Sequence, residues 1–147
     1  EPYVVIASGD CVYKMDYNKV LEYHIEKKAD ITVVCKDMPA GVNVDRFGTI
    51  KMNEESRIEE FEEKPIVAKS HTVSCGIYVI RRRQLIELLE KCAEEDRHDF
   101  VKDILIRYKN IKRIYQHLQK ARTRIRHNHH GWLWLRRSIA KSCIPES

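Results

Sequence analysis

The chain has 147 residues, with 27 Lys and Arg against 22 Asp and Glu and a formal net charge of +5. No apolar run approaches the roughly 20 residues needed to span a bilayer, and five cysteines without a C-x-x-C pair argue against a disulfide framework or a Cys-based zinc site. The length favours one domain or part of one, and we expect a cytoplasmic protein with reduced cysteines and no membrane partner.

The positive charge is concentrated at one end of the chain. Residues 116–147 hold seven of the Lys and Arg residues and one acid, a net charge of +6, which leaves −1 for residues 1–115. A near-neutral body with a basic tail is not the pattern of a nucleic-acid-binding fold. Any polyanion binding is therefore expected in the tail.

The beginning of the chain predicts a strand, a helix and a strand. Residues 3–7 are a continuous apolar run rich in β-branched side chains, which we interpret as a central parallel strand covered on both faces. Residues 16–28 place apolar side chains at helical spacing, with Asp16 available as N-cap and two lysines in the last turn. Residues 31–35 predict a second buried strand, so the unit should have a right-handed crossover.

The middle of the chain continues this alternation. Residues 48–63 alternate polar and apolar side chains around a turn at residues 53–56 and predict a hairpin. Residues 74–80 predict another strand, and residues 83–93 and 100–108 predict two helices. The body is therefore expected to be an α/β fold with a mostly parallel sheet.

Residues 116–147 differ from the body in composition. They hold both tryptophans, four of the seven histidines and five arginines, and their apolar residues follow no consistent period. We place a boundary after residue 115 and expect a divergent basic tail that is out of frame or disordered. Its histidines could take a transition metal, more often as an adventitious site, and its tryptophans could stack on the bases of a polyanion.

Five short islands follow the predicted elements in a fixed order: Ser8-Gly9-Asp10, Arg46-Phe47-Gly48, Phe61-Glu62-Glu63-Lys64-Pro65, Ser74-Cys75-Gly76 and His98-Asp99-Phe100. Asp10 follows a strand end, where open α/β sheets place ligands and where a carboxylate can hold a cation. Lys64 precedes a proline that stiffens the chain and could aim a positive charge into a cleft. From the residues alone, a turn-forming Asp10 and a solvated Lys64 among acids are the commoner readings.

In order and spacing, these islands resemble the middle of the nucleotidyltransferase domain of the glucose-1-phosphate adenylyltransferase family, which makes ADP-glucose from ATP and glucose 1-phosphate in glycogen biosynthesis. The resemblance runs from about residue 3 to residue 115. It implies a partial Rossmann-like domain of the nucleotide-diphospho-sugar transferases, which are GT-A-like. It also implies that the full-length protein is a tetramer.

The resemblance implies roles for individual side chains. Asp10 would be the catalytic residue that binds Mg²⁺ between the nucleotide phosphates. Lys64, beside Glu63, would contact the phosphate of glucose 1-phosphate. Ser74 would hydrogen-bond the sugar phosphate, and Gly76 would let the backbone approach it closely. The two islands without such a role are assigned first to packing and helix initiation.

Departures from the family pattern alter the expected function. Cys11 stands where catalytic members carry His, which resembles the partner subunit that assembles with a catalytic subunit in some bacteria. The five glycines are isolated, so the sequence has no glycine-rich loop for ATP phosphates, and residues 116–118 replace the segment with the second metal-binding acid. We expect the 147 residues to be an inactive fragment; the alternatives are a non-catalytic regulatory partner and a polyanion-binding module.

Overall fold

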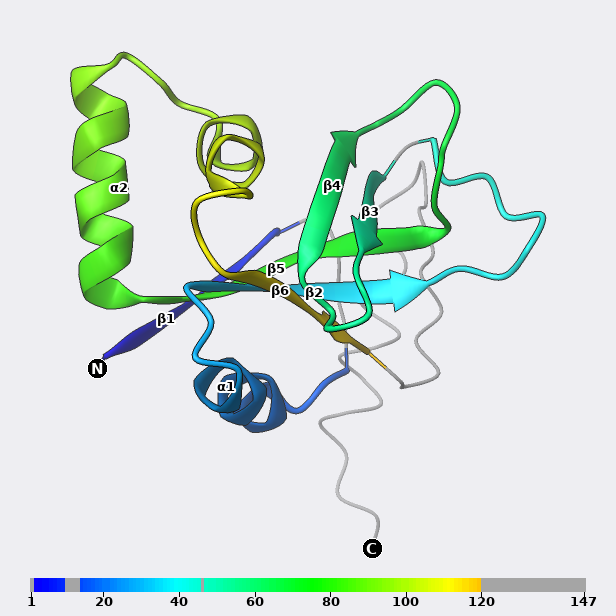
Figure 1. The fold of residues 1–147 in the computed structure, drawn as a ribbon, viewed down its shortest axis with the longest axis horizontal. Helices are drawn as coiled ribbons and strands as arrows, with labels where there is room; N and C mark the ends of the chain where they lie inside the picture. The colour runs from blue at the N-terminus through cyan, green and yellow to red at the C-terminus, as the bar shows by residue number, and fades with distance from the viewer. Residues whose placement is uncertain (1, 10–13, 46, 120–147) are drawn as a thin grey trace, which may run out of the picture.

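The structure, a computed structural model, describes residues 2–9, 14–45 and 47–119. The described chain combines strands and helices (Figure 1). In chain order these elements are β1 (Tyr3–Ala7), α1 (Tyr17–Glu26), β2 (Ile31–Asp37), β3 (Gly48–Met52), β4 (Ile58–Glu63), β5 (Thr72–Arg81), α2 (Arg82–Glu94), the π-helix η1 (Val101–Ile106) and β6 (Ile114–Leu118). The predicted α/β class is confirmed.

The strands form one mixed sheet, in which β4, β3, β5, β2 and β6 follow one another and β1 also pairs with β5. Among the described residues only β2 and β6 pair in parallel, and the other pairs of strands are antiparallel. The prediction of a mostly parallel sheet is therefore wrong. A continuous apolar run indicates that both faces of a strand are covered, but it does not report the direction of its neighbours.

The interpretation of residues 3–7 as a central parallel strand is also wrong. Within the described part of the chain, β1 pairs with β5 alone, and that pairing is antiparallel. Because β2 is also antiparallel to β5, β1 and β2 run in the same direction with β5 between them. The predicted strand, helix and strand are thus all present, but a strand from later in the sequence separates the two strands.

The strand β5 changes partner along one of its edges. The strand β2 pairs with β5 from Thr72 to Ile80, which occupies one edge almost throughout. On the other edge, β3 meets β5 at Val73 and β1 pairs with it from Ile77 onward. We call residues 74–76, which lie between these two partners, the junction segment.

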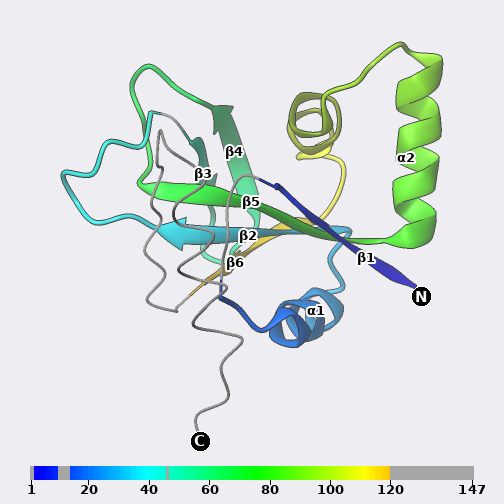
Figure 2. The same cartoon turned by 180° about the vertical axis from the view of Figure 1, so that it is seen from behind.

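The sheet has a separate apolar core on each face. Below the sheet in Figure 1, α1 covers a small core with Val20, Val34 and Ile77 among its buried residues. The opposite core is larger, and α2, η1 and the β3–β4 hairpin contribute to it (Figure 2). The Cys35 and Cys75 side chains are buried, one in each core, as expected for cysteines that behave as small hydrophobic residues.

Several local predictions are confirmed. The Asp16 side chain caps α1 by accepting a hydrogen bond from the Asn18 N–H at 3.0 Å. The predicted hairpin is present as β3 and β4, joined by residues 53–57, and the predicted helix at 83–93 is α2. The Asn53 side chain accepts hydrogen bonds from the N–H groups of Glu55 and Arg57, which explains why the chain turns there.

The strand β6 crosses the expected boundary after residue 115. It pairs with β2 from Ile114 to Leu118, and the Gln119 N–H donates to the Cys35 carbonyl at 2.8 Å. The division into a body and a tail stays a prediction, because the tail from residue 120 onward, with its paired tryptophans and clustered histidines, lies outside the described residues. In the part of the chain that is described, no helix has the length and apolar character needed to cross a membrane.

Candidate functional site

The junction segment contains a bulge whose backbone conformation favours glycine. Opposite β2, the register steps from Val34 paired with Ile77 to Cys35 paired with Ser74, so β5 carries two additional residues there. Gly76 has φ +66°, in the left-handed region, and its N–H donates to the Ser74 hydroxyl oxygen at 3.2 Å. This conformation favours glycine over all other residues.

The same bulge holds the end of β1. The Ser8 N–H donates to the Gly76 carbonyl at 2.9 Å, and a Cβ at position 76 would lie 3.0 Å from the Ser8 Cβ. Two islands that are 66 residues apart in the sequence therefore meet at the point where β5 changes partner. Gly9 follows directly, and Asp10, the predicted metal ligand, lies outside the described residues.

Lys64 lies at the end of β4 in an unusual backbone conformation. Its φ is +47°, and its N–H donates to the Phe47 carbonyl at 3.3 Å. A left-handed conformation is an outlier for a long side chain and is disfavoured again before a proline, at a cost of about 1–3 kcal/mol. Such strain persists where the surroundings fix it, and it is a frequent feature of ligand-binding positions.

Two of the acids near Lys64 pair with other lysines. Glu60 pairs with Lys51 at 3.2 Å and with Lys69 at 3.5 Å, and Glu62 pairs with Lys69 at 2.8 Å. The Lys51 hydrogen bond and charge lower the pKa of Glu60, and Glu62 raises the pKa of Lys69. Among the described residues, no carboxylate lies within ion-pair distance of the exposed Lys64 ammonium group. Both readings of Lys64, a phosphate ligand and a lysine solvated among acids, therefore stay predictions.

The ends of β4 and the junction segment lie on neighbouring strands. Glu62, Thr49 and Val73 are paired side by side across β4, β3 and β5. Two strand spacings of about 4.8 Å place the end of β4 roughly 10 Å from the junction segment. Exposed Glu63 and Lys64 are therefore level with partly exposed Ser74 and Gly76 across the sheet.

Tyr78 lies between these two parts, and an apolar strand pattern does not single it out. Burial raises the pKa of its hydroxyl, the nearby Ser74 side chain lowers it, and the Glu63 charge raises it. Its ring is 8% exposed and packs against Phe100 with the ring centroids 5.1 Å apart. The Ser74 side chain therefore lies beside a buried phenol.

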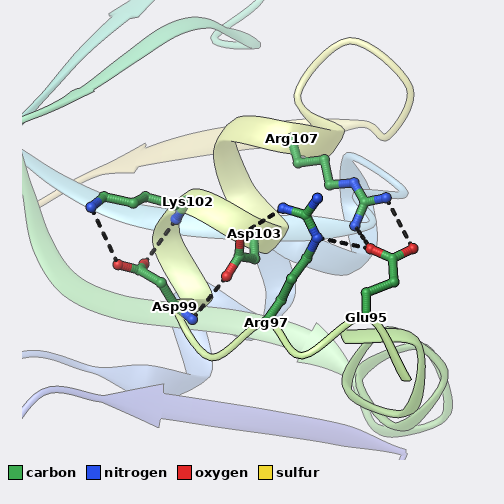
Figure 3. A network of polar contacts seen from close by, with 6 residues as sticks. All are labelled: Glu95, Arg97, Asp99, Lys102, Asp103 and Arg107. Atoms are coloured by element: carbon green, nitrogen blue, oxygen red, sulfur yellow. Dashed lines mark hydrogen bonds and ion pairs between the residues drawn. The ribbon is translucent and has the colours of Figure 1, made fainter. Parts of the chain in front are cut away.

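The last island holds Phe100 in place, as predicted for helix initiation. The Asp99 carboxylate accepts from the Lys102 N–H at 2.9 Å, and Asp103 accepts from the Asp99 N–H at 3.0 Å, which is a reciprocal cap. Figure 3 shows how Arg97 and Arg107 extend this network to Glu95 at the end of α2. The network fixes the turn from α2 to η1 and so the ring that supports Tyr78.

The remaining predictions concern packing and metal binding. Gly48 is buried, and a Cβ there would lie 3.0 Å from both the Phe61 ring and a Glu63 carboxylate oxygen, which confirms its assignment to packing. Within the described ranges, no three His, Cys, Asp or Glu side chains are gathered as a metal site requires. The Mg²⁺ prediction rests on Asp10 and is not tested by the described residues.

Comparisons with known proteins place these residues in context. A family model described as nucleotidyl transferase matches residues 1–134. The chain is 44% identical over 115 residues to the glucose-1-phosphate adenylyltransferase of Thermosipho melanesiensis. The aligned region covers 77% of this chain and 28% of that protein. Proteins of the same name from Bacillus thuringiensis and Bacillus cereus are 48% identical over 105 residues, covering 70% of this chain and 28% of each relative. The chain therefore spans little more than a quarter of these relatives, and the expected resemblance is confirmed.

Proposed function

Because this chain belongs to the nucleotidyl transferase family, we propose that it is part of a glucose-1-phosphate adenylyltransferase subunit and carries the sugar phosphate half of the site. The observation that supports this most is the meeting of Ser8, Ser74 and Gly76 at the junction segment, level with Lys64, which has no ion-pair partner among the described residues. The relatives that share this sequence carry the name of that activity.

The proposed roles follow from the chemistry of each group. Lys64 provides a positive charge for the phosphate of glucose 1-phosphate, and a flexible ammonium group suits an exposed phosphate. Ser74 donates a hydrogen bond to the sugar phosphate while its oxygen orients the Gly76 N–H. Gly76 leaves the backbone open, since it adds no side chain at the bulge. The Glu63 carboxylate would accept a hydrogen bond from a sugar hydroxyl.

In the proposed reaction, an oxygen of glucose 1-phosphate attacks the α-phosphorus of ATP, and pyrophosphate leaves. Positioning and charge neutralisation dominate such transfers, so the chain's part is to hold the nucleophile in place. Mg²⁺ held by Asp10 would neutralise phosphate charge when bound. We further propose that the 147 residues alone are inactive, because their sequence has no glycine-rich loop for ATP phosphates.

A second candidate function is that of a non-catalytic regulatory partner within a tetramer. Cys11 favours it, because a thiol replaces the histidine expected of catalytic members, and this position lies outside the described residues. The two functions share the sugar phosphate site but differ in turnover. A partner subunit would raise the activity of a co-expressed catalytic subunit without forming ADP-glucose itself. We place either protein in the cytoplasm, with polyanion binding by the tail as the weaker alternative.

Calorimetric titration of the full 147-residue chain with glucose 1-phosphate tests the shared site. We expect binding that Lys64→Ala weakens about tenfold, since a charge-assisted hydrogen bond to phosphate contributes roughly 1.5 kcal/mol at an exposed site. Lys69→Ala is the matched control, because it removes an equal charge that already pairs with Glu62. Equal losses in both variants, or equal binding of glucose 1-phosphate and glucose, would refute the proposed site.

A further inference from the structure

A pocket lies where β5 ends, and it is lined by basic side chains. Its volume is about 400 Å³, and its lining includes Arg81, Arg83, Lys112 and Arg113. The connection before β2, the start of α2 and the connection before β6 meet at this end of the sheet, near the N-terminus (Figures 1 and 2). At about 3.3 Å per residue along β5, Arg81 is about 16 Å from Gly76. The cavity is therefore separate from the candidate sugar phosphate site.

Two of these cations are already paired with carboxylates. Asp30 accepts from the Arg113 N–H at 2.8 Å and from its guanidinium group at 3.3 Å, and Glu87 accepts from Arg83 at 3.1 Å. Over the residues that the structure describes, no carboxylate lies within ion-pair distance of Arg81 or Lys112. Four cations and two carboxylates leave the lining with two excess positive charges.

Lys112 is held in place by a neutral partner. With its amide oxygen facing Lys112, Gln84 accepts from the lysine Nζ at 2.9 Å, and its amide nitrogen donates to the Asp30 carbonyl at 3.1 Å. Arg81 lies over the Tyr3 ring, with its guanidinium carbon 5.9 Å from the ring centroid. Both free cations are thus oriented by contacts that do not neutralise them, which is the arrangement a pre-formed anion site needs.

The start of α2 departs from the usual preferences of a helix N-terminus. Arg81 is its N-cap without a side-chain cap, and Arg82 and Arg83 follow in a first turn that contains no acid. Because the positive end of the helix dipole disfavours cations, the arginines there destabilise the start of the helix. An anion in the cavity would offset this cost. Local preferences that are violated without compensation are typical of functional positions.

We propose that this basic pocket, lined by Arg81 and Lys112 among others, binds the phosphate group of a small molecule. The planar guanidinium of Arg81 can donate two hydrogen bonds to one phosphate, and Lys112 adds a point charge. The volume exceeds that of a phosphate ion and matches a small phosphorylated compound rather than an extended polymer. The site is independent of the sugar phosphate site, because none of its lining residues lies there.

The test is an NMR titration of the ¹⁵N-labelled 147-residue chain, carried out with Lys64→Ala to silence the other site. The probes are inorganic phosphate and glycerol 3-phosphate, with sodium chloride keeping the ionic strength constant. We expect saturable shifts at the amides of residues 82–84 and 112–113. Tighter binding of glycerol 3-phosphate identifies a phosphorylated metabolite as the ligand, and tighter binding of the free ion overturns that assignment.

Charge-matched variants make the test specific. Arg81→Gln with Lys112→Gln should weaken binding at least about tenfold, while Lys19→Gln with Lys91→Gln removes two exposed charges elsewhere and should change affinity less than about twofold. Equal losses in the two double variants, or shifts spread over the whole surface, overturn the proposal. If the first double variant does not fold, each of its single substitutions must weaken binding at least about threefold, and a smaller effect overturns the proposal.

Discussion

Burial of His24 should make the stability of the chain fall between pH 6.5 and pH 4. The side chain is 1% exposed, its Nδ1 lies 2.8 Å from the Thr32 hydroxyl oxygen, and Tyr3 packs edge-on against its ring. Its Nε2 has no hydrogen-bond partner in the described part of the chain. Desolvation and then the charge of Arg81 lower its pKa from 6.5 to about 4, opposed by Asp30.

The direction of the effect follows from proton linkage. In the unfolded chain this histidine takes up a proton near pH 6.5, whereas in the folded chain it stays neutral until about pH 4. The unfolded state therefore binds more protons in this window, and acid favours it. A difference of about 2.5 pKa units corresponds to roughly 3 kcal/mol, which is fully present above pH 6.5 and lost by pH 4.

Urea unfolding followed by circular dichroism measures this contribution. His24→Gln should reduce stability at pH 7, and the difference in unfolding free energy from the unmodified chain should shrink by roughly 3 kcal/mol between pH 7 and pH 4. Taking the difference between the two chains cancels the pH-dependent contributions of the carboxylates and of His117 to the unfolding free energy. Burial also lowers the pKa of His117. His98→Gln, at a largely exposed imidazole, is the control, and it should change the unfolding free energy at pH 7 less than His24→Gln does. If the difference in unfolding free energy between His24→Gln and the unmodified chain is the same at pH 7 and pH 4, burial of His24 does not cause the loss of stability in acid.

Three further changes test the local structure. Gly76→Ala should lower the free energy of urea unfolding by about 2–4 kcal/mol, because φ is +66° and the new Cβ would lie 3.0 Å from the Ser8 Cβ at the end of β1. Gly41→Ala, with φ +85° and open space around the new Cβ, should lower it by only about 1–2 kcal/mol. Equal losses in the two variants would contradict the contact with Ser8. Asp99→Ala should cost about 0.5–2 kcal/mol through loss of the cap, and Glu90→Ala, at an exposed position of α2, less than about 0.5. Cys35 should resist iodoacetamide in the folded chain, since burial raises its pKa, and labelling at the unfolded rate without urea would disprove it.

Local features of this fold could be predicted from the sequence because short-range chemistry determines them. An aspartate before a helical pattern gave the cap of α1, and an asparagine in an alternating segment gave the turn of the hairpin. The islands containing Ser8 and Gly76 were recognised separately, and the structure brings them together. Asp10, Cys11 and the tail lie outside the described residues, so their predicted roles stay predictions.

Features that depend on long-range pairing could not be predicted. The place of β5 between β1 and β2 depends on pairing across tens of residues, and an apolar run looks the same for either strand direction. The role of Tyr78 depends on its proximity to Ser74 across the bulge, which no spacing rule anticipates. The basic pocket joins Arg81 to Lys112, two segments that sequence patterns give no reason to connect.

We propose that glucose 1-phosphate binds at the junction segment beside the end of β4. Addition of glucose 1-phosphate to the ¹⁵N-labelled 147-residue chain, followed by NMR at each backbone amide, tests this binding site. We expect the largest shifts at Lys64, Ser74 and Gly76, and we expect glucose alone to leave these amides unchanged. Saturable shifts confined to the basic pocket, or none at the junction segment, would contradict it.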